Sequence, residues 1–114
     1  MPVLRECQTA VVSRNDRWVG VAETEPYEAG WASELIVFIR VLESEGSLTG
    51  AAAAVQISPD GIHWIDEGAR LTLSDAIGQV AFVRLSHFGQ YVRLRAELEY
   101  GSACKVIVTI NAKA

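Results

Sequence analysis

The chain has 114 residues and a formal net charge of −4, and 50% of its residues are hydrophobic. This length holds a single domain, and the mild acidic excess speaks against a nucleic-acid binder, which gathers basic residues on one face. The longest apolar run, residues 35–39, is far too short for a membrane span, so we expect no membrane insertion. The N-terminus has no apolar stretch of the secretory type, which predicts synthesis in the cytoplasm.

The N-terminal part of the chain predicts two short strands. Residues 8–13 and 18–22 have strand-like sequences, and the polar residues 14–17 between them indicate a turn. Residues 1–7 are predicted to be either an ordered strand or an extended arm that reaches a neighbouring molecule.

Two cysteines, Cys7 and Cys104, stand near opposite ends of the chain. One interpretation is that both are buried as small apolar side chains, as in a reducing compartment. The other is a disulfide between the first and last strands, which commonly neighbour each other in β-sandwiches. Together with His63 and His87, the cysteines match no zinc-binding spacing, so we expect no metal site and no cofactor.

The loop 23–34 contains Tyr27 and Trp31 among proline, glycine and acidic residues. Exposed aromatic rings beside carboxylates are what sugar-binding sites use, so this loop is a candidate ligand platform. Trp64 and Trp18 would join the platform only if they are exposed. The alternative interpretation is that the two loop rings cap one end of the fold.

Residues 34–44 form the longest predicted strand, and it is apolar on both sides. In an antiparallel sheet, the side that faces away from the core then needs a cover, supplied by a loop or by another subunit. The core-facing side consists of Leu35, Val37, Ile39 and Val41. The second side, which supplies the candidate interface residues, consists of Ile36, Phe38, Arg40 and Leu42.

The middle of the chain predicts a hairpin. Residues 51–57 are read as a strand despite their run of alanines, because the alternation of the following apolar residues continues from it. Ser58-Pro59-Asp60-Gly61 suits a type I turn, since proline presets φ at the second position. Residues 62–66 then pair back, which predicts Trp64 as a core or rim residue packed against the opposite sheet.

Four further strands are predicted at 70–73, 79–87, 91–99 and 104–112. In the third of these, apolar side chains alternate strictly with arginine and glutamate, which indicates a half-buried strand with a charge-paired outer face. Turn signals recur about every 8–12 residues, as in sandwiches and barrels. The sequence therefore predicts an all-β fold over residues 1–114: a single antiparallel β-sandwich, jelly-roll or Ig-like, of about eight or nine strands.

No combination of residues specifies a chemistry, so the chain is predicted not to be an enzyme. Ser86 and His87 are adjacent in a predicted strand, and their side chains therefore point to opposite faces and cannot form a nucleophile–base pair. A glycine-rich phosphate loop is also missing from the sequence.

The segment SPDGIHW, with YVRLR and KVIVTINAK after it, resembles a recurring pattern in small β-sandwich domains of phage and bacterial surface proteins. The similarity covers roughly residues 50–114. Some of these domains resemble phage head-decoration or accessory virion proteins, and others resemble carbohydrate-binding modules. The resemblance thus implies a phage-type surface or virion component.

Two functions follow as expectations. The first is a structural or interaction subunit, most concretely a capsid decoration or accessory virion protein, which contacts its own copies or a capsid or surface lattice. Such a subunit is expected to be a symmetric homo-oligomer, with a trimer as the favoured form. The second is a carbohydrate-binding module that binds a glycan through Tyr27, Trp31 and Trp64.

Overall fold

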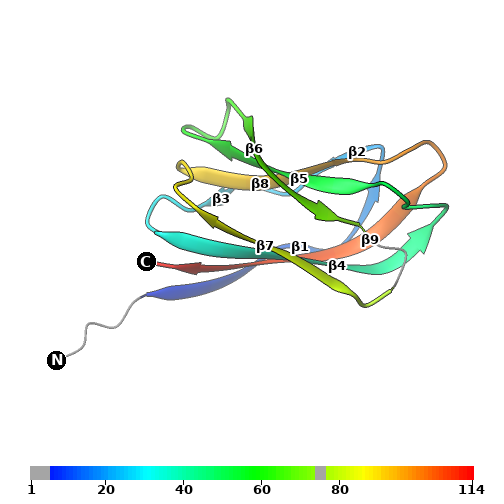
Figure 1. Cartoon of the computed structure of the whole chain (residues 1–114), viewed down its shortest axis with the longest axis horizontal. Coiled ribbons are helices and arrows are strands. Elements are labelled where there is room, and N and C mark those ends of the chain that lie inside the picture. Colours follow the sequence, from blue (N-terminus) through cyan, green and yellow to red (C-terminus); the bar gives the residue numbers. More distant parts are fainter. Residues whose placement is uncertain (1–5, 74–76) are drawn as a thin grey trace.

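The computed structural model describes residues 6–73 and 77–114, and this part of the chain forms nine strands and no helix. The strands make two antiparallel sheets packed face to face, so the predicted all-β sandwich is confirmed (Figure 1). The strands are β1 (Cys7–Val19), β2 (Val21–Glu23), β3 (Tyr27–Glu28), β4 (Glu34–Glu45), β5 (Ala52–Ser58), β6 (Ile65–Thr72), β7 (Val80–Ser86), β8 (Tyr91–Glu97) and β9 (Ala103–Lys113). The described residues include no helix long and apolar enough to cross a membrane.

The two sheets differ in size. Sheet A has four strands in the order β1-β9-β4-β7. Sheet B has five strands in the order β2-β8-β5-β6, and the short β3 also pairs with β8. The chain passes repeatedly from one sheet to the other, and every strand pair is antiparallel. The edge strands are therefore β1 and β7 in sheet A, and β6 with the short β2 and β3 in sheet B.

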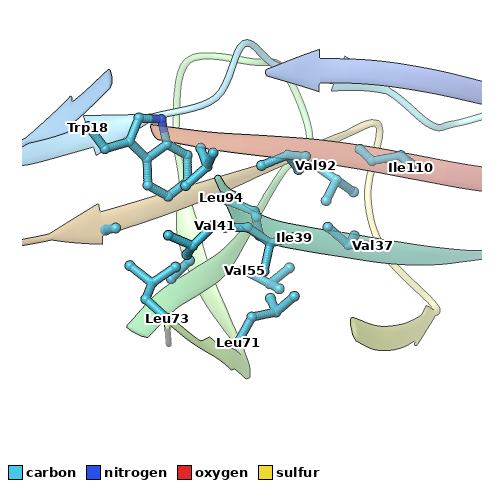
Figure 2. Close-up of a cluster of buried hydrophobic side chains, with 14 of the residues drawn as sticks. Trp18, Val37, Ile39, Val41, Val55, Leu71, Leu73, Val92, Leu94 and Ile110 are labelled. Carbon is cyan, nitrogen blue, oxygen red and sulfur yellow. The ribbon is translucent and has the colours of Figure 1, made fainter. Parts of the chain in front are cut away.

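The core lies between the sheets and is formed by every second side chain of the long strands (Figure 2). This alternation follows from the pleat of a strand, which turns successive side chains to opposite faces. Trp18 is the largest side chain in the cluster and is only 3% exposed. Other core residues are Leu35, Val37, Ile39, Val41, Val55, Leu71, Leu73, Val92, Leu94, Val106, Val108 and Ile110.

The predicted turn at 14–17 is wrong, because β1 runs through it to Val19. The strand stays paired with β9 by shifting register twice, between Val11 and Ser13 and between Arg14 and Asp16. Asn15 takes a φ of 57° at the second shift. Such bulges allow a polar stretch to remain part of a strand. The sequence of residues 14–17 resembles a turn and gives no indication of this.

The strands predicted at 62–66 and 70–73 are in fact one strand, β6. It begins at Ile65, and its register against β5 shifts between Ala54 and Gln56. The alanine run beside it is strand, as predicted.

The two cysteines lie far apart, although their strands are neighbours as expected. Cys7 stands opposite Lys113, and Cys104 stands opposite Trp18 at the other end of the β1–β9 pair. Nine residues of a strand span about 30 Å, whereas a disulfide requires Cα atoms within about 7 Å. Cys104 is buried, which raises the pKa of its thiol, but Cys7 is exposed, so the prediction of two buried thiols holds for Cys104 only.

The predicted N-terminal arm falls mostly on residues 1–5, which lie outside the described residues. Cys7 already belongs to β1, and the backbone N–H of Ala114 donates to the carbonyl of Glu6 at 2.8 Å.

Candidate functional site

The outer face of sheet A carries apolar side chains where a solvated sheet would carry polar ones. Along β4 the core-facing residues are buried, while Ile36 and Phe38 on the other side remain half-exposed. The register places Phe38 between Thr109 of β9 and Phe82 of β7, so these side chains share the outer face. The two phenyl rings lie 6.1 Å apart, which is within the range of favourable aromatic pairs.

Strand β7 contributes the most exposed part of this face. Val80 is 55% exposed and Phe82 is 52% exposed, and the guanidinium of Arg84 lies 5.2 Å from the centre of the Phe82 ring. The alternation in residues 79–87 already puts Val80, Phe82 and Arg84 on the second side of the predicted strand, but only the pairing of β7 with β4 brings Val80 and Phe82 to the same face as Phe38. Val11 of β1 stands opposite Thr109, and Ile107 of β9 stands opposite Arg40, so both lie on this outer face as well. We call the following residues the apolar patch: Val11, Ile36, Phe38, Val80, Phe82 and Ile107.

Two of the four candidate interface residues expected from the sequence, Ile36 and Phe38, belong to this patch. The register places Arg40 between Ile107 and Val80, so Arg40 lies beside the patch with Ile36 and Phe38. Leu42 is half-buried and stands at the register shift between Val41 and Glu43, outside the regular ladder. The structure thus brings Ile36, Phe38 and Arg40 together and leaves Leu42 at the margin.

Two shallow hollows adjoin the patch. One of about 220 Å³ is lined by residues of β4, β7 and β9, among them Phe38, Val80 and Ile107. The other, of about 420 Å³, lies at the opposite end of the same strands and includes the charged groups of Glu34, Arg84 and Lys113. An exposed apolar surface with a charged rim is typical of a protein-interaction site.

The outer face of sheet B is charged and well hydrogen-bonded. Arg93 of β8 donates to Gln56 at 2.8 Å and forms an ion pair with Glu23 at 2.8 Å. Gln56 in turn donates to Asp66 at 3.0 Å. Because these side chains satisfy one another, this face provides no comparable apolar contact surface.

Trp64 also lies on this charged face. Its ring packs against the guanidinium of Arg93, 4.2 Å from the ring centre, and Arg93 points away from the core because Val92 and Leu94 point into it. Trp64 does not pack against the opposite sheet as predicted. The reason is that the turn extends to residue 64, so the strand alternation begins only at Ile65.

The aromatic residues of the expected glycan platform do not share one face. Tyr27 pairs with the buried Val92 and packs against the core, and its hydroxyl donates to Gln8. This partial burial raises the pKa of Tyr27. Trp31 is 38% exposed in the loop, Trp18 is buried, and Trp64 lies on the outward side of sheet B. Tyr27 and Trp64 are therefore on opposite sides of the same sheet.

The turn before Trp64 is held by its own side chains. The hydroxyl of Ser58 accepts the N–H of Gly61 at 2.8 Å and donates to Asp60 at 3.0 Å. The Asp60 carboxylate accepts the backbone N–H groups of Ile62 and His63 at 2.9 and 2.8 Å, and its second oxygen lies 2.6 Å from Nδ1 of His63. These hydrogen bonds, above all those from His63, hold the pKa of Asp60 well below its ordinary value of 3.8.

This turn predicts a specific pH dependence of stability. The pKa of Asp60 is lower in the folded state than in the unfolded state. The contribution of Asp60 to the free energy of unfolding is therefore complete above its ordinary pKa of 3.8, and this contribution is lost as the pH falls below 3.8. Asp60→Asn is therefore expected to lower the free energy of unfolding at neutral pH. The variant is also expected to lose less of this free energy than the wild type does as the pH falls. Urea unfolding between about pH 2 and pH 6 measures this. Asp66→Asn is the control, and an equally reduced loss in both variants would contradict the prediction.

Within residues 6–73 and 77–114, no three His, Cys, Asp or Glu side chains converge as a metal site would require. The hydrogen-bonded groups of the Asp60 turn and of the Arg93 network hold local structure. The apolar patch has no hydrogen-bonded network of this kind, and it is therefore our candidate interaction site.

The fold is similar to that of the SPBc2 prophage-derived protein YomS, with a TM-score of 0.61 and 10% sequence identity. The match covers 100% of this chain and 98% of that protein. The PBSX exported protein XepA is also similar, with a TM-score of 0.56 and 10% identity over 96% of this chain, which spans 36% of XepA. At these identities the likeness concerns the fold alone.

No curated protein matches the chain in sequence. Residues 41–114, which extend from within β4 to the end of β9, match the family described as "Domain of unknown function (DUF6385)". The chain therefore belongs to the DUF6385 family.

Proposed function

We propose that this protein is a non-enzymatic interaction subunit of a phage-related assembly, most concretely a capsid decoration or accessory virion protein that acts as a symmetric homo-oligomer. The observation that carries the proposal is the apolar patch, which gathers on one outer face while the opposite face is charged. The similarity of the whole fold to a prophage-derived protein supports the phage context.

The energetics favour covering this patch. Apolar surface removed from water stabilises an association by roughly 25 cal/mol per Å², before the costs of association are subtracted. Phenylalanine and the branched aliphatic residues have few rotatable side-chain bonds, so ordering them on binding costs less than ordering long charged side chains. Copies of this chain, or a capsid or surface lattice, are the partners that this proposal names.

Phe38→Glu tests the proposal. Phe38 lies at the centre of the patch, and a carboxylate there must be desolvated when a partner covers it, so the variant is expected to remain folded and to form a smaller oligomer. Light scattering behind a sizing column measures the mass, and circular dichroism reports the folded state.

Val21→Lys is the matched control. Val21 is 59% exposed on sheet B and pairs with Glu97, so a lysine there is accommodated away from the patch. The control is expected to keep the wild-type mass. Equal masses for wild type and Phe38→Glu would refute the assignment of the patch to self-association.

A further inference from the structure

Strand β7 is an edge strand that lacks the protection found at the other edges. Exposed edges invite pairing with another chain, and proteins commonly block them with bulges, charges, prolines or short strands. Strand β1 has two register shifts, and β2 and β3 are three and two residues long. Strand β6 carries Asp66 and Glu67 followed by Gly68. Strand β7, by contrast, pairs residue by residue with β4 from Val80 to Ser86, without a register shift.

The free side of β7 is available for hydrogen bonding. Among the described residues, no backbone hydrogen bond beyond the ladder with β4 involves residues 80–86. The strand contains no proline and a single charged residue, Arg84. Its unpaired N–H and C=O groups therefore form a template for one more strand.

The inner side chains of β7 also lack a complete cover. Ala81 and Val83 face the core, yet both are only half-buried. A hollow of about 200 Å³ opens beside this edge, and its lining includes Thr72 of β6 as well as Ile39 and Val41 of the core. A strand added next to β7 would cover these side chains, in addition to pairing the backbone.

The sequence of β7 suits pairing with a second copy of itself. A two-fold axis perpendicular to the sheet can relate the two copies. When this axis passes through Phe82 or Val83, each outward-facing residue of one β7 strand stands opposite an outward-facing residue of the other. When the axis passes Val83, Phe82 stands opposite the second copy's Arg84, which repeats the contact between these residues within one chain. Because Arg84 is the only charge in the strand, neither register places like charges directly opposite.

The size of the patch gives a reason for this pairing. Four strands about 4.8 Å apart and seven residues of about 3.3 Å each give sheet A an outer face of roughly 440 Å², and the apolar patch is part of this face. A stable interface buries about 800 Å² on each partner, so the patch of one copy falls short. Two copies joined at β7 present one continuous outer face of roughly 880 Å² that contains both apolar patches.

We propose that two copies of this chain pair antiparallel through their β7 strands, which extends sheet A to eight strands and joins the two apolar patches. The inference rests on the proposed function and specifies its building unit: a two-fold pair, in place of the three-fold form expected from the sequence. The face then remains available for stacking on further copies or on a lattice.

The test uses the Phe38→Glu background, in which face contacts are weakened and edge contacts remain. This variant is expected to have twice the 12.4 kDa chain mass. Adding Ala81→Lys places an inward-pointing charge on the edge, which blocks strand pairing, and is expected to halve the mass. Adding Ala69→Lys instead is the matched control, since Ala69 is also a half-buried alanine of an edge strand packed against the core. That control is expected to remain a dimer.

Amide hydrogen exchange provides a second measurement that does not depend on the folding of the lysine variants. Alternate amides of β7 in Phe38→Glu are expected to exchange more slowly when the protein is dimeric than after dilution to monomer. A Phe38→Glu protein that is already monomeric would overturn edge pairing and leave the proposed function standing. A dimer without slowed exchange in β7 would overturn edge pairing as well. Failure of the proposed function would appear differently, as an unchanged mass in Phe38→Glu.

Discussion

Replacing Trp18 with alanine is expected to lower the free energy of unfolding by about 3–5 kcal/mol. Trp18 is 3% exposed and lies between the two sheets, near the end of β1 (Figure 2). Its removal leaves a cavity that the surrounding strands can fill only in part, which adds to the lost burial of the ring. Urea unfolding followed by circular dichroism measures the change without relying on tryptophan fluorescence.

Trp31→Ala is the control for this substitution. Trp31 is 38% exposed in the loop before β4, so its removal is expected to change the free energy of unfolding by about 1 kcal/mol or less. Similar losses in the two variants would mean that the buried position of Trp18 is not what makes it important. Because both substitutions remove one indole ring, the difference between them measures the effect of burial on the free energy of unfolding.

Gly46→Ala is expected to cost roughly 2–5 kcal/mol, from two sources. The φ of Gly46 is +68°, a left-handed conformation that costs an alanine about 1–2 kcal/mol. A Cβ at this position would also lie 2.5 Å from the carbonyl oxygen of Gly101 and 3.1 Å from the Cα of Ser102. Since these are backbone atoms, relieving the clash requires the loops after β4 and β8 to separate, at about 1–3 kcal/mol.

Gly20→Ala separates the two sources. Gly20 has a similar φ of +60°, but no atom lies within 4 Å of its added Cβ. This variant is therefore expected to lose only the conformational part, about 1–2 kcal/mol. Unfolding both variants in urea gives the cost of the loop contact as the difference between them. A difference near zero would mean that the loops separate freely at Gly46.

The contrast between the two outer faces is central to the proposed function. The face of sheet B satisfies its charges internally through Arg93, while the face of sheet A has Phe82 and Val80 half-exposed. The family match covers residues 41–114 and thus includes β7, whereas Phe38 precedes it. The edge pairing that we propose accordingly depends on residues inside the region that the family shares.

The sequence by itself determined the fold class and most strand positions. Alternation in 34–44 and 91–99 correctly separates core-facing from outward residues, because the pleat of a strand has a strict period of two. The same alternation identified Ile36 and Phe38 as a second apolar side, which the structure places on the surface of sheet A. These are local properties, and a local pattern is enough to read them.

Only the tertiary structure decided how strands meet. Turn-like residues at 14–17 became a bulged strand because β9 offers a long continuous partner, and the thiols of Cys7 and Cys104 were separated by the register of that pair. Phe82 became part of the patch because β7 lies beside β4 at the edge of sheet A, with the same face outward. Strand order and register arise from contacts between residues distant in sequence, and periodicity within one strand carries no information about them.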